Sequence, residues 1–282
     1  MISSFAPSAA LAPFVEGYVV YDFPPAMRNG VPAALTVFPD TRPFACFIFG
    51  DALQATHKRQ HVEHTRSGIG GFQTYRVDMQ GAGHMRGVSV RFTPWGASCL
   101  MPAPADDMVD VRVDFRDMFR AREIEALEDE LSALPDARAR AHRVDSFLLQ
   151  QVQPSRLDEL VQAAAICLVQ ARGTLAARTL ARQLGLSERS LERRFLAATG
   201  VGPKKFARVV RLQSALAGYQ RTYSWTDTAA DTGYCDQSHL IRDCQAMLGM
   251  SPEVLVGTPL SEAAQAFQAA VPAALRPARM YL

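Results

Sequence analysis

Three histidines in the segment HKRQHVEH, His57, His61 and His64, could supply nitrogen ligands to a metal ion. On a helix, His57 and His61 would share one face at the i, i+4 spacing that metal ligands use. The segment is polar and precedes the glycine-rich SGIGG, which is typical of a solvated loop or an edge strand. We therefore predict a solvated charged segment here and no metal site.

No group of residues has the spacing of a catalytic site. The sequence contains no GxSxG, no P-loop and no GxGxxG before a helix. The five cysteines are an odd number without CxxC spacing, which indicates small buried hydrophobes in a reduced cytoplasmic protein. The N-terminus lacks the pattern of a signal peptide, and no apolar run is long enough to span a bilayer. We predict no catalytic residue, no enzyme activity, no cofactor and no membrane partner.

Two stretches in the last third of the chain carry side chains suited to the edges of DNA bases. Arginine can bond guanine at two atoms, glutamate accepts from cytosine, glutamine suits adenine, and isoleucine packs on the thymine methyl. The base-reading candidates are Arg189, Glu192, Arg193, Gln237, Ser238, Ile241 and Arg242. The phosphate-contact candidates are Arg194, Lys204, Lys205, Arg208 and Arg221. For each cation taken singly a solvated surface role stays open, and for Arg194 so does a pair with an acid.

The elements around these side chains are two copies of one helical pattern. The first copy is LARQLGLSERSLERRFLAATGVGPKKF, residues 180–206, and the second is TAADTGYCDQSHLIRDCQAMLGMSPEVL, residues 228–255. Gly185 and Gly233 occupy equivalent places and can adopt the positive φ that reverses a chain after a helix. Such a repeat indicates a tandem array of helical units rather than one enzyme core.

A capping residue follows each of these glycines. Ser187 fits the N-cap of a second helix in the first copy, and Asp236 or Cys235 fits it in the second. A helix, a glycine turn and a capped second helix make a helix-turn-helix, whose second helix enters the DNA major groove. Leu191 and Phe195 are spaced i, i+4 and should face the core.

In these details the sequence resembles the AraC-type transcription regulators. The segments that carry the resemblance are LSERSLERRF from residue 186, GVGP from residue 200, GYCDQS from residue 233 and GMSP from residue 249. The resemblance covers about residues 156–256 and implies two helix-turn-helix units joined by one long helix. It also shows a departure, because the family has Phe-Lys where this chain has Cys244-Gln245. We therefore expect a looser second unit, and we expect Cys244→Phe with Gln245→Lys to tighten DNA binding. The alternative is that Met247 and Leu248 have repacked around the smaller side chain, in which case Phe would overpack the core.

The N-terminal half has a different pattern. FACFIFG, from residue 44, is typical of a buried strand, and TYRVDM and VSVRF alternate apolar with polar residues as half-buried strands do. The glycine-rich QGAGHMRG between the last two predicts a hairpin. Helical spacing begins near residue 113 and is interrupted by Pro135.

We accordingly predict an α+β fold, in which a small β-rich N-terminal sensor domain precedes an all-α domain with two helix-turn-helix units joined by a long helix. The predicted parts are 1–112 for ligand sensing or dimerisation, a helical linker region at 113–155, a tandem helix-turn-helix domain at 156–256, and a C-terminal tail at 257–282.

Charge is distributed unevenly between these parts. The whole chain has a net charge of +2. Residues 156–256 hold 13 Lys and Arg against 9 Asp and Glu, a net +4, whereas residues 1–155 hold 15 against 18, a net −3. Positive charge on the helical part favours attraction to the phosphate backbone, although a charge of this size is also ordinary for a hundred residues.

These patterns together predict a cytoplasmic, sequence-specific transcription regulator that binds double-stranded promoter or operator DNA. The resemblance implies control by a small-molecule effector or by dimerisation through the N-terminal domain, and it leaves RNA polymerase and a second copy of the chain open as partners. The alternative is an enzyme or ligand carrier whose β-rich domain binds a small molecule, with the helical domain in a secondary role.

Overall fold

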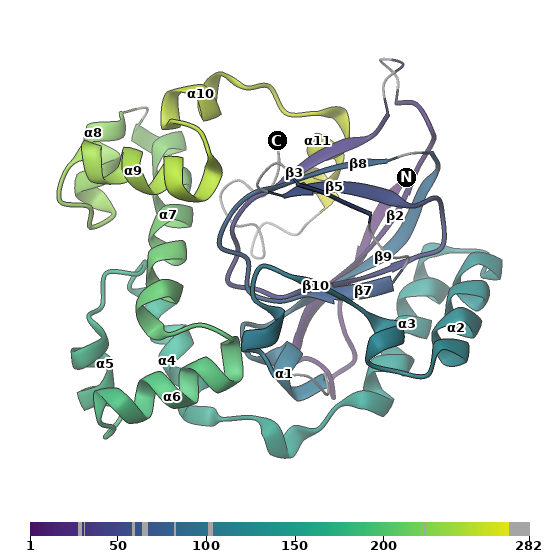
Figure 1. Cartoon of the computed structure of the whole chain (residues 1–282), viewed down its shortest axis with the longest axis horizontal. Helices are drawn as coiled ribbons and strands as arrows, with labels where there is room; N and C mark the ends of the chain where they lie inside the picture. The colour runs from purple at the N-terminus through teal and green to yellow at the C-terminus, as the bar shows by residue number, and fades with distance from the viewer. Residues whose placement is uncertain are drawn as a thin grey trace.

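The computed structural model describes residues 1–27, 30, 32–57, 60–63, 67–81, 83–100, 104–222 and 224–270. Its N-terminal half is β-rich and its C-terminal half is helical, which confirms the predicted fold class (Figure 1). The strands are β1 (Ile2–Phe5), β2 (Val15–Phe23), β3 (Ala34–Val37), β4 (Phe44–Ile48), β5 (Leu53–His57), β6 (Gln60–Glu63), β7 (Ser67–Gly70), β8 (Val77–Gly81), β9 (Met85–Phe92) and β10 (Arg112–Asp114).

These strands form two antiparallel sheets. One has six strands in the order β1-β2-β9-β4-β7-β10, and the other has four in the order β3-β8-β5-β6. The strands predicted from FACFIFG and VSVRF are β4 and β9, which pair with each other inside the larger sheet.

Side chains of the larger sheet alternate between two separate cores. Val88, Val90 and Phe92 of β9 are completely buried against helices on the outer face. Met85 of the same strand packs on the opposite face with Tyr21 of β2, toward the smaller sheet. Because the side-chain period of a strand is two, the residues between the outer-face positions point into the space between the sheets.

The glycine-rich segment QGAGHMRG does not close a hairpin. The strand before it, β8, pairs with β3 and β5, whereas the strand after it, β9, pairs with β2 and β4. The connection therefore passes from one sheet to the other, and the predicted hairpin is wrong. Alternation in a sequence shows where strands run, but it does not show which strands pair.

Two helices cover the outer face of the larger sheet, namely α2 (Ala121–Ala133) and α3 (Ala137–Gln151). Asp136 caps α3 by accepting from the Ala139 amide, and Asp145 of α3 accepts from the Tyr18 hydroxyl of β2 at 2.8 Å. Residues 113–155, predicted as a helical linker region, thus contribute to the core of the β-rich half.

The helical half begins after a short 3-10 turn, η3 (Pro154–Arg156). Its helices are α4 (Glu159–Gln170), α5 (Ala177–Gln183), α6 (Glu188–Thr199), α7 (Pro203–Thr222), α8 (Trp225–Asp231), α9 (Gln237–Leu248) and α10 (Pro252–Gly257). In Figure 1, α7 connects the α5–α6 pair with the α8–α9 pair, on the side away from α2 and α3. No helix among the described residues is long and apolar enough to span a bilayer.

The two halves share a continuous apolar contact. Phe72, which follows β7, lies 5.8 Å from Phe206 of α7 between ring centroids, and Phe38 and Trp95 belong to the same cluster. The backbone amide of Arg76 donates to the carbonyl of Met247 in α9 at 2.9 Å.

The chain then returns to the β-rich half. A separate helix, α11 (Glu262–Ala270), packs on β3 and β1, and its Phe267 belongs to the core of the two sheets. The beginning of the predicted tail is therefore a docked helix.

Candidate nucleic-acid interface

The first helix-turn-helix consists of α5 and α6. Gly185 has a φ of +67°, which reverses the chain after α5, and Ser187 caps α6 by accepting from the Ser190 amide. Leu191 and Phe195 are almost completely buried, as the i, i+4 spacing predicted. The Phe195 ring packs edge-on against Phe206 of α7, with centroids 5.2 Å apart. These contacts fix α6 on the connecting helix.

The second helix-turn-helix consists of α8 and α9 and repeats the same geometry. Gly233 has a φ of +75°, and Asp236 caps α9 by accepting from the His239 amide, which decides between the two predicted caps. Trp225 of α8 stacks on Tyr219 of α7, with ring centroids 4.0 Å apart. The second unit is thus fixed to the other end of the same helix.

The connecting helix α7 has 20 residues, which gives a length of about 30 Å. Successive major grooves on one side of B-DNA are about 34 Å apart. A rod of this length can therefore hold α6 and α9 at adjacent major grooves.

The outward faces of α6 and α9 bring most of the predicted base-reading residues to the surface. Arg189, Arg193, Ser238 and Arg242 are exposed, and Ile241 is half-buried. The three arginines make no ion pair within the part of the chain that the structure describes. Their guanidinium groups are consequently available to an external acceptor.

Two other base-reading candidates have contacts within the protein. A Cβ built on Gly202 would lie 2.1 Å from the Glu192 Oε1, so this carboxylate lies against the loop between α6 and α7. Gln237 is half-buried, and its Oε1 accepts from the Thr226 hydroxyl at 3.1 Å. Both side chains must leave these contacts before they can read a base.

Among the phosphate-contact candidates, some side chains are exposed and others form ion pairs within the protein. Lys204 and Lys205, in the first turn of α7, are exposed. Arg194 instead donates to Asp158 at 2.7 Å, and Arg208 donates to the buried Asp243 at 2.9 Å. The pair with an acid that was left open for Arg194 therefore forms, and Arg208 forms one as well.

Some sequence predictions lie outside what the structure describes. The side chains of these residues are outside the described part of the structure: Arg221, His57, His61 and His64. Among the described residues, no group of three or more His, Cys, Asp or Glu is arranged to hold a metal ion. Cys235 is exposed, so the prediction of a buried hydrophobe at every cysteine is wrong there.

A family model described as a helix-turn-helix domain, of the AraC type, matches residues 180–256, which include both of these units. Residues 180–256 are thus an AraC-type helix-turn-helix domain. A second family model, described as a domain of unknown function (DUF6597), matches residues 3–114 of the β-rich half. No curated protein matches the chain.

Several solved structures are similar at low identity. ToxT from Vibrio cholerae is 11% identical over 85% of this chain and 97% of its own, with a TM-score of 0.44. ToxT bound to (E)-4-(8-methylnaphthalen-1-yl)but-3-enoic acid is 9% identical over 85% and 97%, with a TM-score of 0.47. The AraC-like activator CuxR is 14% identical over 76% and 86%, with a TM-score of 0.22. Such distant similarity does not decide how this protein works.

The departure from the family pattern lies in the core of this AraC-type domain. Cys244 is completely buried in a cluster with Met247 and Leu248, and burial raises the pKa of its thiol to about 12. Its neighbour Asp243 is buried as well, and it accepts from both Arg208 and the Tyr234 hydroxyl. Burial raises the pKa of Tyr234, and the Asp243 carboxylate raises it further. The second unit is therefore held in part by polar contacts of Asp243, next to the position at which the family pattern has an aromatic side chain.

The β-rich half also contains a cavity of about 260 Å³ between the two sheets, which no sequence pattern indicated. Glu16, Asp40, Arg42 and Arg91 form a charged cluster in its wall. No spacing signal connects residues so far apart in the chain, because the sheet pairing alone brings them together.

Proposed function

We propose that this regulator binds operator DNA with α6 and α9 in two adjacent major grooves. The observation that carries the proposal is that α7 holds two capped recognition helices with exposed outward arginines at its two ends. In this proposal the protein acts in the cytoplasm, where it meets the operator DNA.

Each contact has a role in this proposal. Arg189 and Arg193 read bases in one groove, and Arg242, with Ser238 and Ile241, reads them in the next. Lys204 and Lys205 bind phosphates beside the first groove.

The ion-paired and internally bonded candidates have secondary roles. Arg194 and Arg208 orient the helices through their acids, and the exposed half of Arg208 remains within reach of a phosphate. Glu192 and Gln237 read bases only after leaving their contacts within the protein, and Arg221 is an additional phosphate candidate.

We propose residues 156–256 as the DNA-binding part and the β-rich half as the part that controls it. A mainly apolar cavity with a few polar side chains is typical of a small-molecule site. Control then operates through a small-molecule effector, and the packed contacts at Phe72 and Arg76 transmit it to the DNA-binding units. Dimerisation through the N-terminal domain is the alternative mode of control, and contact with RNA polymerase is a further proposal.

Binding is tested with the full chain. Fragments of the source genome that it retains are selected and sequenced, and binding to the enriched site is measured by fluorescence anisotropy against a scrambled duplex. Arg189→Ala with Arg193→Ala should remove the preference for the selected site. Arg120→Ala, at an arginine that is 88% exposed in the β-rich half, is the matched control and should have no effect. If no sequence is enriched, or if both variants behave alike, the proposal is wrong.

A further inference from the structure

The cavity between the sheets has mainly apolar walls. The larger sheet contributes Val19 and Tyr21 of β2 and Phe44 of β4, and the smaller sheet contributes residues such as Leu35 and Met79. Its volume of about 260 Å³ is slightly below the roughly 300–1,000 Å³ of common ligand pockets. A small, mainly apolar molecule fits walls of this kind and size.

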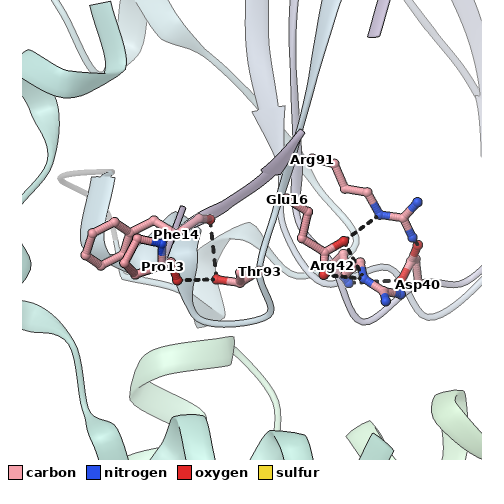
Figure 2. Close-up of polar contacts among 7 residues, drawn as sticks. All are labelled: Pro13, Phe14, Glu16, Asp40, Arg42, Arg91 and Thr93. Atoms are coloured by element: carbon pink, nitrogen blue, oxygen red, sulfur yellow. Dashed lines mark hydrogen bonds and ion pairs between the residues drawn. The ribbon is translucent and has the colours of Figure 1, made fainter. Parts of the chain in front are cut away.

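One end of the cavity contains four charged side chains that neutralise one another (Figure 2). Arg42 contacts Glu16 at 2.8 Å and Asp40 at 3.5 Å, whereas Arg91 contacts Asp40 at 2.9 Å and Glu16 at 3.2 Å. All four side chains are between 12% and 19% exposed. Burial alone would raise the pKa of Asp40, but Arg91 and Arg42 outweigh it and lower that pKa below its ordinary value. Both acids and both bases are therefore already paired.

The other end is closed by a segment from the far end of the chain. Phe267 of α11 lines the cavity and packs against Tyr21 and Phe23, with ring centroids 5.3 Å and 5.6 Å away. The charged cluster lies at the opposite end of the same strands, since Arg91 is paired in register with Gly17. Between Gly17 and Phe23 the strand extends about 20 Å.

One end of the cavity contacts the helical half, and the other end is connected to it by a short segment of chain. At the charged end, the Gln213 amide of α7 donates to the carbonyl oxygen of Pro39, next to Asp40. At the other end, residues 258–261 alone separate α10 from α11, and Ser261 donates to the carbonyl oxygen of Ala34 in β3. Four residues span at most about 14 Å, so the second helix-turn-helix cannot move far while α11 is docked.

We infer that this cavity binds an uncharged, mainly apolar small molecule with one hydrogen-bonding end, and that α11 is the wall that couples this ligand to the second helix-turn-helix. The inference rests on the proposed function only in its consequence for DNA binding.

The paired charges of the cluster favour a neutral ligand over a charged one. An additional carboxylate would be buried beside two ionised acids without a free cation, and a cation would lack an unpaired acid. Burial of an unpaired charge is costly, whereas a hydroxyl can share the hydrogen-bonding capacity of the cluster.

The wall formed by Phe267 determines the direction of coupling. The cavity exists with Phe267 in place, so a ligand inside it adds contacts to the docked form of α11. By linkage, it must then stabilise docking and hold the second unit against the β-rich half.

Calorimetry on the full chain with a matched pair of probes tests the ligand class. We expect 2-naphthalenemethanol to bind about tenfold or more tightly than 2-naphthoate, since an uncompensated charge costs at least that much. Asp40→Asn, or Glu16→Gln if the first variant does not fold, leaves two arginines sharing one acid and should shift the preference toward the carboxylate. Equal or tighter binding of the carboxylate to the unaltered chain, or binding of neither probe, overturns the inference.

Hydrogen exchange of residues 262–270 tests the coupling in the same samples. The alcohol should slow exchange in α11, and Ser89→Leu, which fills the cavity from β9, should abolish both the binding and this protection. Arg120→Ala, at a side chain that is 88% exposed in the β-rich half, is the control and should retain both. Alcohol binding without protection of α11 refutes the coupling. DNA binding is measured in a separate experiment. If the probe binds normally but DNA does not bind, the proposed function is wrong and the inference about the ligand stands.

Discussion

The two helix-turn-helix units have the same backbone design but different interiors. Both second helices have 12 residues, a side-chain N-cap and a glycine with positive φ at the C-terminus. At equivalent positions, the first unit has Arg194 and Phe195, whereas the second has Asp243 and Cys244. The first therefore uses an aromatic core and a half-exposed ion pair, and the second uses a small thiol and a buried carboxylate. Caps and turns thus set the frame of a unit, and different side chains can fill it.

The largest expected effect comes from exchanging the two core residues. Phe195→Cys should lower the free energy of unfolding by about 3–4 kcal/mol, because it removes most of a buried ring that packs on Phe206. The reciprocal Cys244→Phe should cost about 1–3 kcal/mol, because the site is already filled by neighbours such as Met247. Urea unfolding followed by circular dichroism measures both, with the exposed Leu196→Ala as a near-neutral control. Stabilisation by Cys244→Phe would instead show that the second unit is loosely packed, as the family pattern predicts.

The next largest effect is a difference between the two ion pairs in their contribution to the free energy of unfolding. Arg208→Ala leaves the carboxylate of Asp243, 5% exposed, without its cation and should cost about 3 kcal/mol. Arg194→Ala removes a pair whose partners are 40% and 24% exposed, and it should cost about 0.5–1 kcal/mol. The same unfolding experiment compares them. Equal losses would mean that the Tyr234 hydroxyl alone is enough to satisfy Asp243.

The local signals in the sequence predicted the helical half well. Gly185, Ser187 and Asp236 act within a few residues of themselves, so their spacing predicted the turns and the first N-cap and limited the second N-cap to Asp236 or Cys235. The i, i+4 positions of Leu191 and Phe195 likewise predicted which face of α6 is buried. Such features depend on neighbours along the chain, and these are visible in the sequence.

Features that depend on tertiary pairing were not predictable. Arg208, the cation that pairs with Asp243, is 35 residues away from it, and the cluster of Glu16, Asp40 and Arg91 forms only after β2 pairs with β9. The docking of α11 depends on complementarity between Phe267 and a sheet built from the other end of the chain. A single sequence contains no periodicity that reports such contacts.

The recognition faces should contribute to specificity at separate positions. Arg193→Ala and Arg242→Ala should each weaken specific binding by about 1–3 kcal/mol and relax base preference at a different position of the operator. Anisotropy titrations against duplexes with single base changes measure this directly. An equal loss on all sequences would make the altered arginine a phosphate contact, and loss of preference at the same position for both would contradict two separate grooves.

The smallest effect concerns the exposed end of α9, where Gln245 stands in place of the lysine of the family pattern. Gln245→Lys should leave the melting temperature unchanged, because the side chain is exposed. If this end of α9 approaches a phosphate, the added cation releases about one more counterion, and the slope of log K against log salt steepens by about one. Arg120→Lys, in the β-rich half, keeps the charge unchanged and is the control. An unchanged slope would mean that the C-terminal end of α9 is held away from the DNA, consistent with the Arg76 amide already bonding to the carbonyl of Met247. The second unit would then contact the operator only through the first turns of its recognition helix.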